Sequence, residues 1–183
     1  MQLLEKSEIM DKATVDRAIN RMAYEILERN KGAEDLVMIG IQQRGVSLAK
    51  AIRARIKEVE GIKLPFGTLD ITFYRDDLTR LSAHPIVSET DIAFSIEGKK
   101  IILVDDVLYS GRTIRAAIEE LFDMGRPEKI ELAVLVDRGN RELPIMADYA
   151  GKYVPTAKSE YIRMEVSENG EIGRVSVCAK EDN

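Results

Sequence analysis

The sequence predicts an α/β fold in which a twisted, mostly parallel sheet is flanked by helices. Short segments that are apolar throughout alternate with amphipathic segments of helical period, and glycine-containing turns join them. Strands buried on both faces are typical of parallel sheets, and the alternation predicts strand-helix-strand units. The 183 residues are 45% hydrophobic, enough for one core. We therefore expect a single domain over residues 1–183, with a small hood contributed mainly by the region from about residue 137.

The first third of the chain predicts a helix, a strand and a second helix. Apolar residues recur at spacings of three and four over residues 14–27, and Gly32 ends this helix. Residues 36–41 form an apolar strand, and the turn Gln43-Arg44-Gly45 leads into the next helix. The residues of that helix expected to face inward are Ala49, Ile52, Ile56 and Val59.

A further strand is predicted over residues 66–73, followed by a long polar loop or hairpin over residues 74–90. Residues 101–104 and 130–136 predict two more buried strands. The helix between them ends at Gly125. Its apolar face is expected to comprise Ile114, Ala117, Ile118, Leu121 and Phe122.

The last third predicts a hairpin, in which residues 161–166 pair with residues 172–177. The Asn169-Gly170 dipeptide between them favours a type I′ turn, because both residues tolerate positive φ.

The composition excludes several kinds of site. One cysteine and one histidine leave no disulfide framework, thiolate metal cluster or histidine-based catalytic triad. Carboxylates, arginines and backbone amides must carry any chemistry. The net charge of −5 argues against indiscriminate nucleic-acid binding. The apolar runs fall far short of the ~20 residues of a membrane span, and the N-terminus has no signal-like apolar region. We expect a cytoplasmic protein with no membrane partner.

The richest chemical signal follows the apolar segment 101–104. Ser110-Gly111-Arg112-Thr113 offers hydroxyls, a guanidinium and amides at a helix start, which suit a phosphate monoester. Asp105 and Asp106 would repel that phosphate, but they can accept hydrogen bonds from neighbouring sugar hydroxyls and support positive charge. The segment predicts a ribose 5-phosphate pocket. The alternative is that the two acids only cap the helix or line a turn.

These residues carry a resemblance to a known family. Residues 105–113 resemble the 5-phosphoribosyl-1-diphosphate (PRPP) motif of type I phosphoribosyltransferases. The form Val-Asp-Asp-Val-Leu-Tyr-Ser-Gly-Arg-Thr is similar to that of the pyrimidine operon attenuation protein/uracil phosphoribosyltransferase branch. Further similar segments, in the same order, cover residues 28–32, 69–78, 125–127, 132–139 and 141–144.

The resemblance implies that uracil displaces diphosphate from PRPP to give UMP, with Mg²⁺ carried by PRPP and no direct protein ligand. Asp105, Asp106, Arg44 and Arg75 would be catalytic, with Gln43 and Arg44 in a diphosphate loop and Arg75 in a flexible loop that closes over the site. The residues implied to bind PRPP or UMP are Gln43, Arg44, Asp105, Asp106, Val107, Leu108, Tyr109, Ser110, Gly111, Arg112 and Thr113. Those of the uracil hood are Asp137, Arg138 and Ile162.

One position of the motif bears on the choice of base. Purine enzymes with a similar motif have an aspartate two residues before the glycine, where this chain has Tyr109. The resemblance therefore implies a pyrimidine.

The family also implies a regulatory partner, the leader mRNA of a pyrimidine operon, bound in response to UMP or UTP. The implied RNA-binding residues are Arg17, Arg21, Arg141 and Lys152. The chain departs from the family pattern at Asn20, Tyr24, Gln43, Asn140, Met146 and Tyr153. Two alternatives stay open, a salvage uracil phosphoribosyltransferase that has lost RNA binding and a nucleotide-sensing regulator without significant catalysis. A homodimer or homotetramer is expected.

Overall fold

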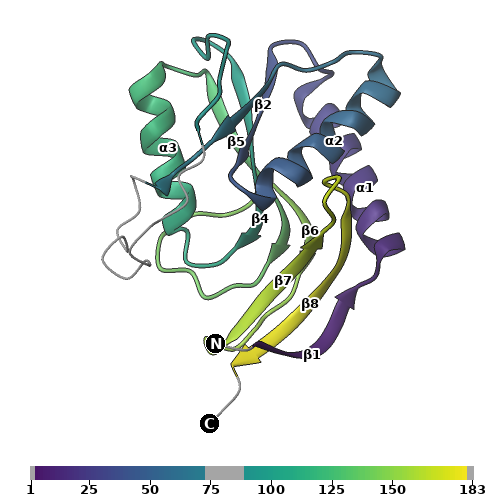
Figure 1. Ribbon diagram of the computed structural model, residues 1–183. Helices are drawn as coiled ribbons and strands as arrows, with labels where there is room; N and C mark the ends of the chain where they lie inside the picture. The colour runs from purple at the N-terminus through teal and green to yellow at the C-terminus, as the bar shows by residue number, and fades with distance from the viewer. Residues whose placement is uncertain (1–2, 73–88, 181–183) are drawn as a thin grey trace.

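The computed structural model describes residues 3–72 and 89–180 (Figure 1). The three helices in these ranges are α1 (Lys12–Asn30), α2 (Arg44–Glu60) and α3 (Arg112–Met124). The strands are β1 (Leu3–Met10), β2 (Leu36–Ile41), β3 (Phe66–Leu69), β4 (Lys100–Leu108), β5 (Lys129–Asp137), β6 (Tyr149–Tyr153), β7 (Glu160–Val166) and β8 (Ile172–Lys180). The predicted loop over residues 74–90 lies almost wholly outside the described residues.

The main sheet has five parallel strands in the order β3-β2-β4-β5-β6. Helices α1 and α2 cover one face and α3 covers the other (Figure 1). A separate apolar core lies on each face, one built around α1 and α2 and one around α3. The α/β fold class is confirmed. Its central strand β4, which carries the predicted pocket, is paired on both sides by β2 and β5.

The hood is a second sheet of three antiparallel strands in the order β1-β8-β7. The sequence did not predict its N-terminal strand: Leu3 pairs with Lys180, close to the other end of the chain. Strand β6, in the region assigned to the hood, is instead the edge strand of the main sheet. Local pattern could not show the place of β1, because its partner β8 is distant in sequence. β6 pairs with the preceding strand β5, in parallel, but Pro144, Gly151 and Pro155 interrupt the pattern of this stretch.

Two helix boundaries have identifiable caps. Helix α1 begins earlier than predicted because the Asp11 carboxylate accepts a hydrogen bond from the Thr14 N–H, 2.7 Å away. This bond, with Arg17 nearby, lowers the pKa of Asp11. Helix α1 ends at Asn30, and its C-cap is Lys31, whose φ of 57° is left-handed. The predicted stop, Gly32, is the next residue along the chain.

The sequence prediction is wrong for two residues expected to face the core. Val59 is 42% exposed and Phe122 is 59% exposed. Val59 lies in the last turn of α2. In α3 the buried face includes Ala116 and Glu120 as well as Ile114, Ala117 and Leu121, so its centre is rotated away from Phe122.

The β7–β8 hairpin is confirmed, but its turn is not type I′. Gly170 has a φ of 84°, whereas Asn169 is not among the described residues with positive φ. The loop closes through hydrogen bonds from the Gly170 N–H to the Ser167 carbonyl and from the Ser167 N–H to the Glu171 carbonyl, both 2.9 Å. The longer loop therefore requires one left-handed residue where a type I′ turn requires two.

A buried polar cluster supports the amino end of β5. Glu131 is 1% exposed and accepts hydrogen bonds from Asn30 Nδ2 at 2.8 Å and the Tyr149 hydroxyl at 2.7 Å. Lys129 Nζ and Arg29 Nε also contact its other oxygen. Burial raises the pKa of Glu131, but the hydrogen bonds from Asn30, Lys129 and Tyr149 outweigh it and leave the pKa lowered.

We predict that Glu131→Gln lowers the free energy of unfolding at pH 7 by about 2 kcal/mol, because it removes a buried charge and leaves its donors poorly matched. A lowered pKa in the folded state means that this stabilisation is present above the ordinary value of 4.5 and is lost as pH falls through the folded value. Urea unfolding from pH 7 to pH 3 should therefore show the two proteins converging. Glu58→Gln, which removes an exposed partner of Arg55, serves as the control and should change stability little.

Candidate functional site

The site begins with two carboxylates at the carboxyl end of β4. Asp105 is 7% exposed, and its Oδ1 accepts a hydrogen bond from the Asp106 N–H at 2.9 Å. Asp106 Oδ1 in turn accepts from the Val107 N–H at 3.0 Å. These bonds orient both side chains at the edge where open parallel sheets bind ligands. The carboxylates do not cap α3, which begins six residues after Asp106 at Arg112.

The first turn of α2 packs directly onto this end of β4. A Cβ atom on Gly45 would lie 2.5 Å from the Val104 carbonyl oxygen and 3.3 Å from Asp105 Oδ1, so only glycine permits the approach. The Gln42–Gln43 peptide is cis. Arg44 Nη1 lies 4.0 Å from Asp106 Oδ2. The structure thus brings the predicted diphosphate loop, residues 42–45, against the predicted ribose carboxylates.

The phosphate loop, residues 109–113, joins β4 to α3. Gly111 has a φ of 93° and precedes the first helical residue, Arg112. The N-cap residue Gly111 has no side chain to cap the helix, the Arg112 N–H donates to Ser110 Oγ at 3.3 Å, and no acidic residue lies in the first turn. The amides at this end of α3 therefore face an environment that favours an anion.

The Arg138 side chain contacts the phosphate loop from the residue that follows β5. Its guanidinium carbon lies 4.1 Å from the centroid of the Tyr109 ring, and Arg138 is 5% exposed. Its Nε and Nη2 donate to Thr156 Oγ1 and the Ala157 carbonyl at 2.8 and 2.9 Å. The backbone N–H of Arg138 donates to the Leu108 carbonyl at 3.0 Å. This N–H is thus engaged within the chain, and the side chain instead fixes the Tyr109 ring.

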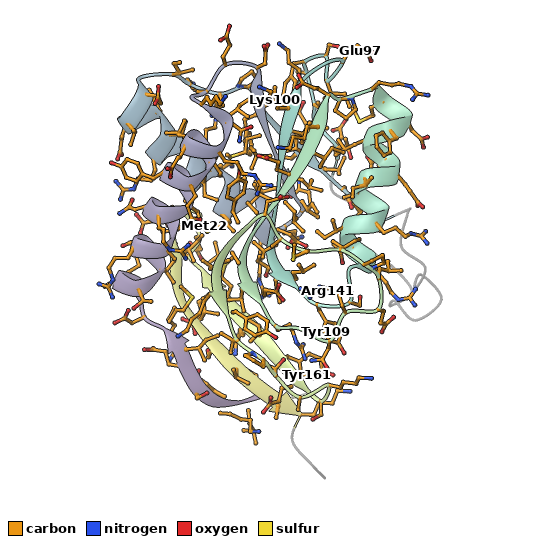
Figure 2. All side chains as sticks on the ribbon, turned by 180° about the vertical axis from the view of Figure 1, so that it is seen from behind. Met22, Glu97, Lys100, Tyr109, Arg141 and Tyr161 are labelled. Carbon is orange, nitrogen blue, oxygen red and sulfur yellow. The ribbon has the colours of Figure 1, made fainter. Side chains whose placement is uncertain are left out.

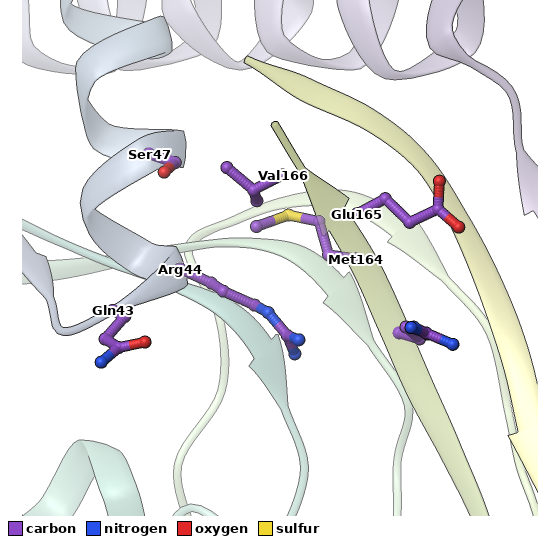
Figure 3. A pocket seen from close by; sticks show the side chains of 7 residues that line it. Gln43, Arg44, Ser47, Met164, Glu165 and Val166 are labelled. Carbon is purple, nitrogen blue, oxygen red and sulfur yellow. The ribbon is translucent and has the colours of Figure 1, made fainter. Parts of the chain in front are cut away.

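A cavity of about 530 Å³ separates the diphosphate loop from the hood. Figure 3 shows Arg44 extending from the start of α2 toward the strand that carries Met164, Glu165 and Val166. The lining residues that the sequence did not single out are Ser47, Arg163, Met164, Glu165 and Val166. Ile162, predicted for the uracil hood, is partly buried and packs against the core beneath α1 and α2, and its role toward the base stays a prediction.

Both flanks of the segment that contains Arg75 are anchored side by side. Thr68 and Asp91 exchange two backbone hydrogen bonds of 2.9 Å, and the Asp70 N–H donates to Thr90 Oγ1 at 3.0 Å. The Thr90 hydroxyl donates to Glu120 on α3 at 2.9 Å. Burial raises the pKa of Glu120, and the Thr90 bond partly offsets this effect. Arg75 itself lies outside the described residues.

The predicted RNA-binding residues fall in two places. Arg21 on α1 donates to the Ala150 and Gly151 carbonyls of β6, and Lys152 on β6 donates to the Ile9 carbonyl of β1. Arg17 lies on the same helix and contacts Thr14 Oγ1. Arg21 and Lys152 therefore lie where α1, β6 and the end of β1 meet, and Arg17 is one helical turn from Arg21. Arg141 is separate from them and donates to the Tyr109 carbonyl at 2.7 Å (Figure 2).

Residues 5–168 match the model of the phosphoribosyl transferase domain. The chain is also 59% identical over 170 residues to the bifunctional protein PyrR of Caldicellulosiruptor bescii, covering 93% of each protein. The chain belongs to the PyrR family of phosphoribosyltransferases. Other PyrR family relatives include the bifunctional protein PyrR of Acetivibrio thermocellus, 55% identical over 96% of this chain and 95% of the relative. That of Deinococcus radiodurans is 50% identical over 97% of each.

Solved structures agree with the fold of this PyrR family member. The hypoxanthine phosphoribosyltransferase of Trypanosoma cruzi superposes with a TM-score of 0.70 at 18% identity, covering 97% of this chain and 98% of that one. A hypoxanthine phosphoribosyltransferase from Staphylococcus aureus gives a TM-score of 0.67 at 20% identity, covering 86% and 81%. At these identities the likeness concerns the type I phosphoribosyltransferase fold alone. None of the helices in the described ranges is long and apolar enough to cross a membrane.

Proposed function

We propose that this protein is a cytoplasmic uracil phosphoribosyltransferase that also binds pyrimidine operon leader mRNA when UMP or UTP occupies its site. The observation that carries the proposal is the contact between the first turn of α2 and Asp105, beside the phosphate loop. This contact brings together the residues predicted to bind the diphosphate, the ribose and the 5-phosphate of PRPP. The high identity to bifunctional PyrR proteins supports both halves of the function.

In the proposed reaction, a bond forms between uracil N1 and ribose C1 while the bond from C1 to the diphosphate oxygen breaks, its electron pair leaves with the diphosphate, and the N1 proton passes to solvent or the leaving diphosphate. The amides and hydroxyls of the phosphate loop hold the 5-phosphate. Asp105 and Asp106 accept hydrogen bonds from the ribose hydroxyls, and their charge stabilises the positive charge that develops on the ribose. Arg44 and the start of α2 face the departing diphosphate, while Arg75, also predicted to be catalytic, lies outside the described residues.

Mg²⁺ fits this arrangement as a companion of the substrate. Its preferred ligands are oxygens, which the diphosphate and water would supply without a direct ligand from the protein. Within residues 3–72 and 89–180 no cluster of three or more His, Cys, Asp or Glu residues could hold a metal. When bound, Mg²⁺ would neutralise charge on the diphosphate as it leaves.

Two assays separate the candidate functions. Formation of UMP from uracil and PRPP with Mg²⁺ tests the enzyme, and binding of a pyrimidine operon leader hairpin with and without UMP tests the regulator. The proposal requires both activities. Turnover without hairpin binding would leave the salvage enzyme, while UMP-dependent hairpin binding without turnover would leave the nucleotide-sensing regulator. A homodimer or homotetramer also stays a prediction, to be measured by light scattering.

We predict strong selection of uracil over hypoxanthine. Tyr109 occupies the position where an acid would partner the purine imidazole nitrogen, and Arg138 holds its ring in place. An unpartnered polar atom in the base pocket costs purines binding energy in the transition state. We expect kcat/KM for uracil to exceed that for hypoxanthine by at least about a hundredfold. Comparable values would contradict the pyrimidine assignment.

Arg17 gives the cleanest test of the RNA surface. Its described bond is to Thr14 within its own helix, so its removal leaves the contacts that join α1 to β6. Arg17→Gln should weaken hairpin binding with UMP present and lower the slope of log affinity against log salt by about one, since one phosphate contact is lost. Uracil turnover should not change. An unaltered salt slope would remove Arg17 from the interface.

A further inference from the structure

Two loops at the site are joined by hydrogen bonds between their backbones. The carbonyl of Ser110, in the phosphate loop, accepts hydrogen bonds from the Glu142 and Leu143 N–H groups at 2.9 and 3.1 Å. Glu142 also pairs with Arg112, its Oε2 lying 2.7 Å from Arg112 Nε. Glu142 and Leu143 belong to the β5–β6 loop, residues 138–148. The conformation of the phosphate loop therefore depends on that of the β5–β6 loop.

Arg141 lies at the centre of this junction. Its Nη1 donates to the Tyr109 carbonyl at 2.7 Å, and its Nε donates to the Ile145 carbonyl at 2.8 Å. Its Nη2 pairs with the Asp137 carboxylate at the end of β5. The side chain is 23% exposed. A single guanidinium thus holds the start of the phosphate loop, the end of β5 and the middle of the β5–β6 loop in one arrangement.

We propose that Arg141 is a positioning residue of the PRPP and UMP site, and that through it nucleotide binding organises the β5–β6 loop for RNA. The inference rests on the proposed function and changes the role expected for Arg141, from a direct phosphate contact to a bond inside the protein. Each of its three nitrogens already donates within the chain. The planar guanidinium of arginine is needed because the three acceptors lie in different directions. The single ammonium group of a lysine cannot match all three.

The same loop reaches the surface on either side of Arg141. Asn140 has a left-handed φ of 58° and donates to the Thr156 carbonyl at 2.8 Å, while Met146 is 80% exposed. UMP, held by the amides of the phosphate loop, would favour the arrangement in which the phosphate loop is hydrogen-bonded to the β5–β6 loop. This arrangement fixes the β5–β6 loop, which carries Asn140 and Met146. The effect must be reciprocal, so RNA would tighten UMP binding by the same factor.

The test compares Arg141→Gln and Arg141→Lys with the parent. Arg55→Gln is the matched control, because it removes an exposed arginine that pairs with Glu58 on α2. Calorimetry gives the Kd for UMP, steady-state kinetics give KM for PRPP and kcat, and titration of a leader hairpin with and without UMP gives the coupling. Thermal unfolding identifies any variant that is not folded, in which case Arg141→Lys decides.

We expect Arg141→Gln to raise the Kd for UMP and the KM for PRPP about tenfold while kcat falls less than threefold. Hairpin affinity without UMP should stay within twofold of the parent, and its enhancement by UMP should disappear. Arg141→Lys should recover part of each loss. Unchanged UMP affinity, with hairpin binding weakened equally in the presence and absence of UMP, would overturn the inference in favour of a direct RNA contact. If the parent binds UMP but shows neither turnover nor hairpin binding, the proposed function fails while the UMP affinities still decide the role of Arg141.

Discussion

Replacing Asp106 with asparagine is expected to lower uracil turnover by roughly 30- to 1,000-fold, corresponding to about 2–4 kcal/mol of transition-state stabilisation. The substitution preserves shape but removes a negative charge beside the proposed position of the ribose carbon, where positive charge would develop. The Asp106 side chain is 20% exposed and lies 4.0 Å from Arg44, so solvent screens this charge only in part. Steady-state kinetics with uracil and PRPP measure the effect, and Asp105→Asn should behave in the same way.

Asp35→Asn provides the control for this experiment. Asp35 immediately precedes β2, at the opposite end of the sheet from Asp106, and pairs with Lys99 on the surface. Its left-handed φ of 59° is one that asparagine also tolerates. The control should retain full turnover. If Asp106→Asn and Asp105→Asn both stay within about threefold of the parent, the two acids do not serve the ribose.

Gly45→Ala is expected to affect both stability and catalysis. The added methyl group would meet the Val104 carbonyl oxygen at 2.5 Å and the Asp105 Cα at 3.0 Å, so the start of α2 must move away from β4. Overpacking against backbone should cost about 3 kcal/mol of unfolding free energy. The same displacement moves Arg44 away from Asp106 and should lower turnover about a hundredfold.

Chemical denaturation and uracil kinetics measure the two effects of Gly45→Ala. Gly173→Ala makes the same change in β8, where the new methyl group would lie 3.7 Å from Glu165, an ordinary contact distance. That control should keep stability and turnover near the parent values. A Gly45→Ala protein that is as stable and active as the parent would show that the close approach of α2 to β4 is not required.

Much of the main sheet follows from local pattern, for physical reasons that differ between elements. β2 matches its predicted range because it is buried on both faces and needs no partner to be recognised. The sequence predicts the buried faces of the helices less well. The apolar residues of α3 cover more of its circumference than the sheet can bury, as Ile118, Leu121 and Phe122 show. β3 ends at Leu69, short of the predicted residue 73.

The residues of the candidate site also differ in whether the sequence alone predicts them. The carboxylates and the phosphate loop are contiguous in sequence, so one segment predicts them together. Ser47 and Arg163, which line the cavity, come from elements more than a hundred residues apart, and they meet only because the hood folds back over α2. The roles of Arg138 and Arg141 are likewise visible only once the acceptors of their hydrogen bonds are known.

The pairing of β1 with β8 also determines the order in which the molecule can be assembled. The five strands of the main sheet lie within residues 36–153, so their pairing closes shorter loops than the pairing of β1 with β8. Leu3 pairs with Lys180, and a contact between residues so far apart costs more loop-closure entropy and forms slowly. We therefore expect the hood, and with it the cavity between α2 and β7, to be among the last parts to form, after the sheet that carries Asp105 and Asp106.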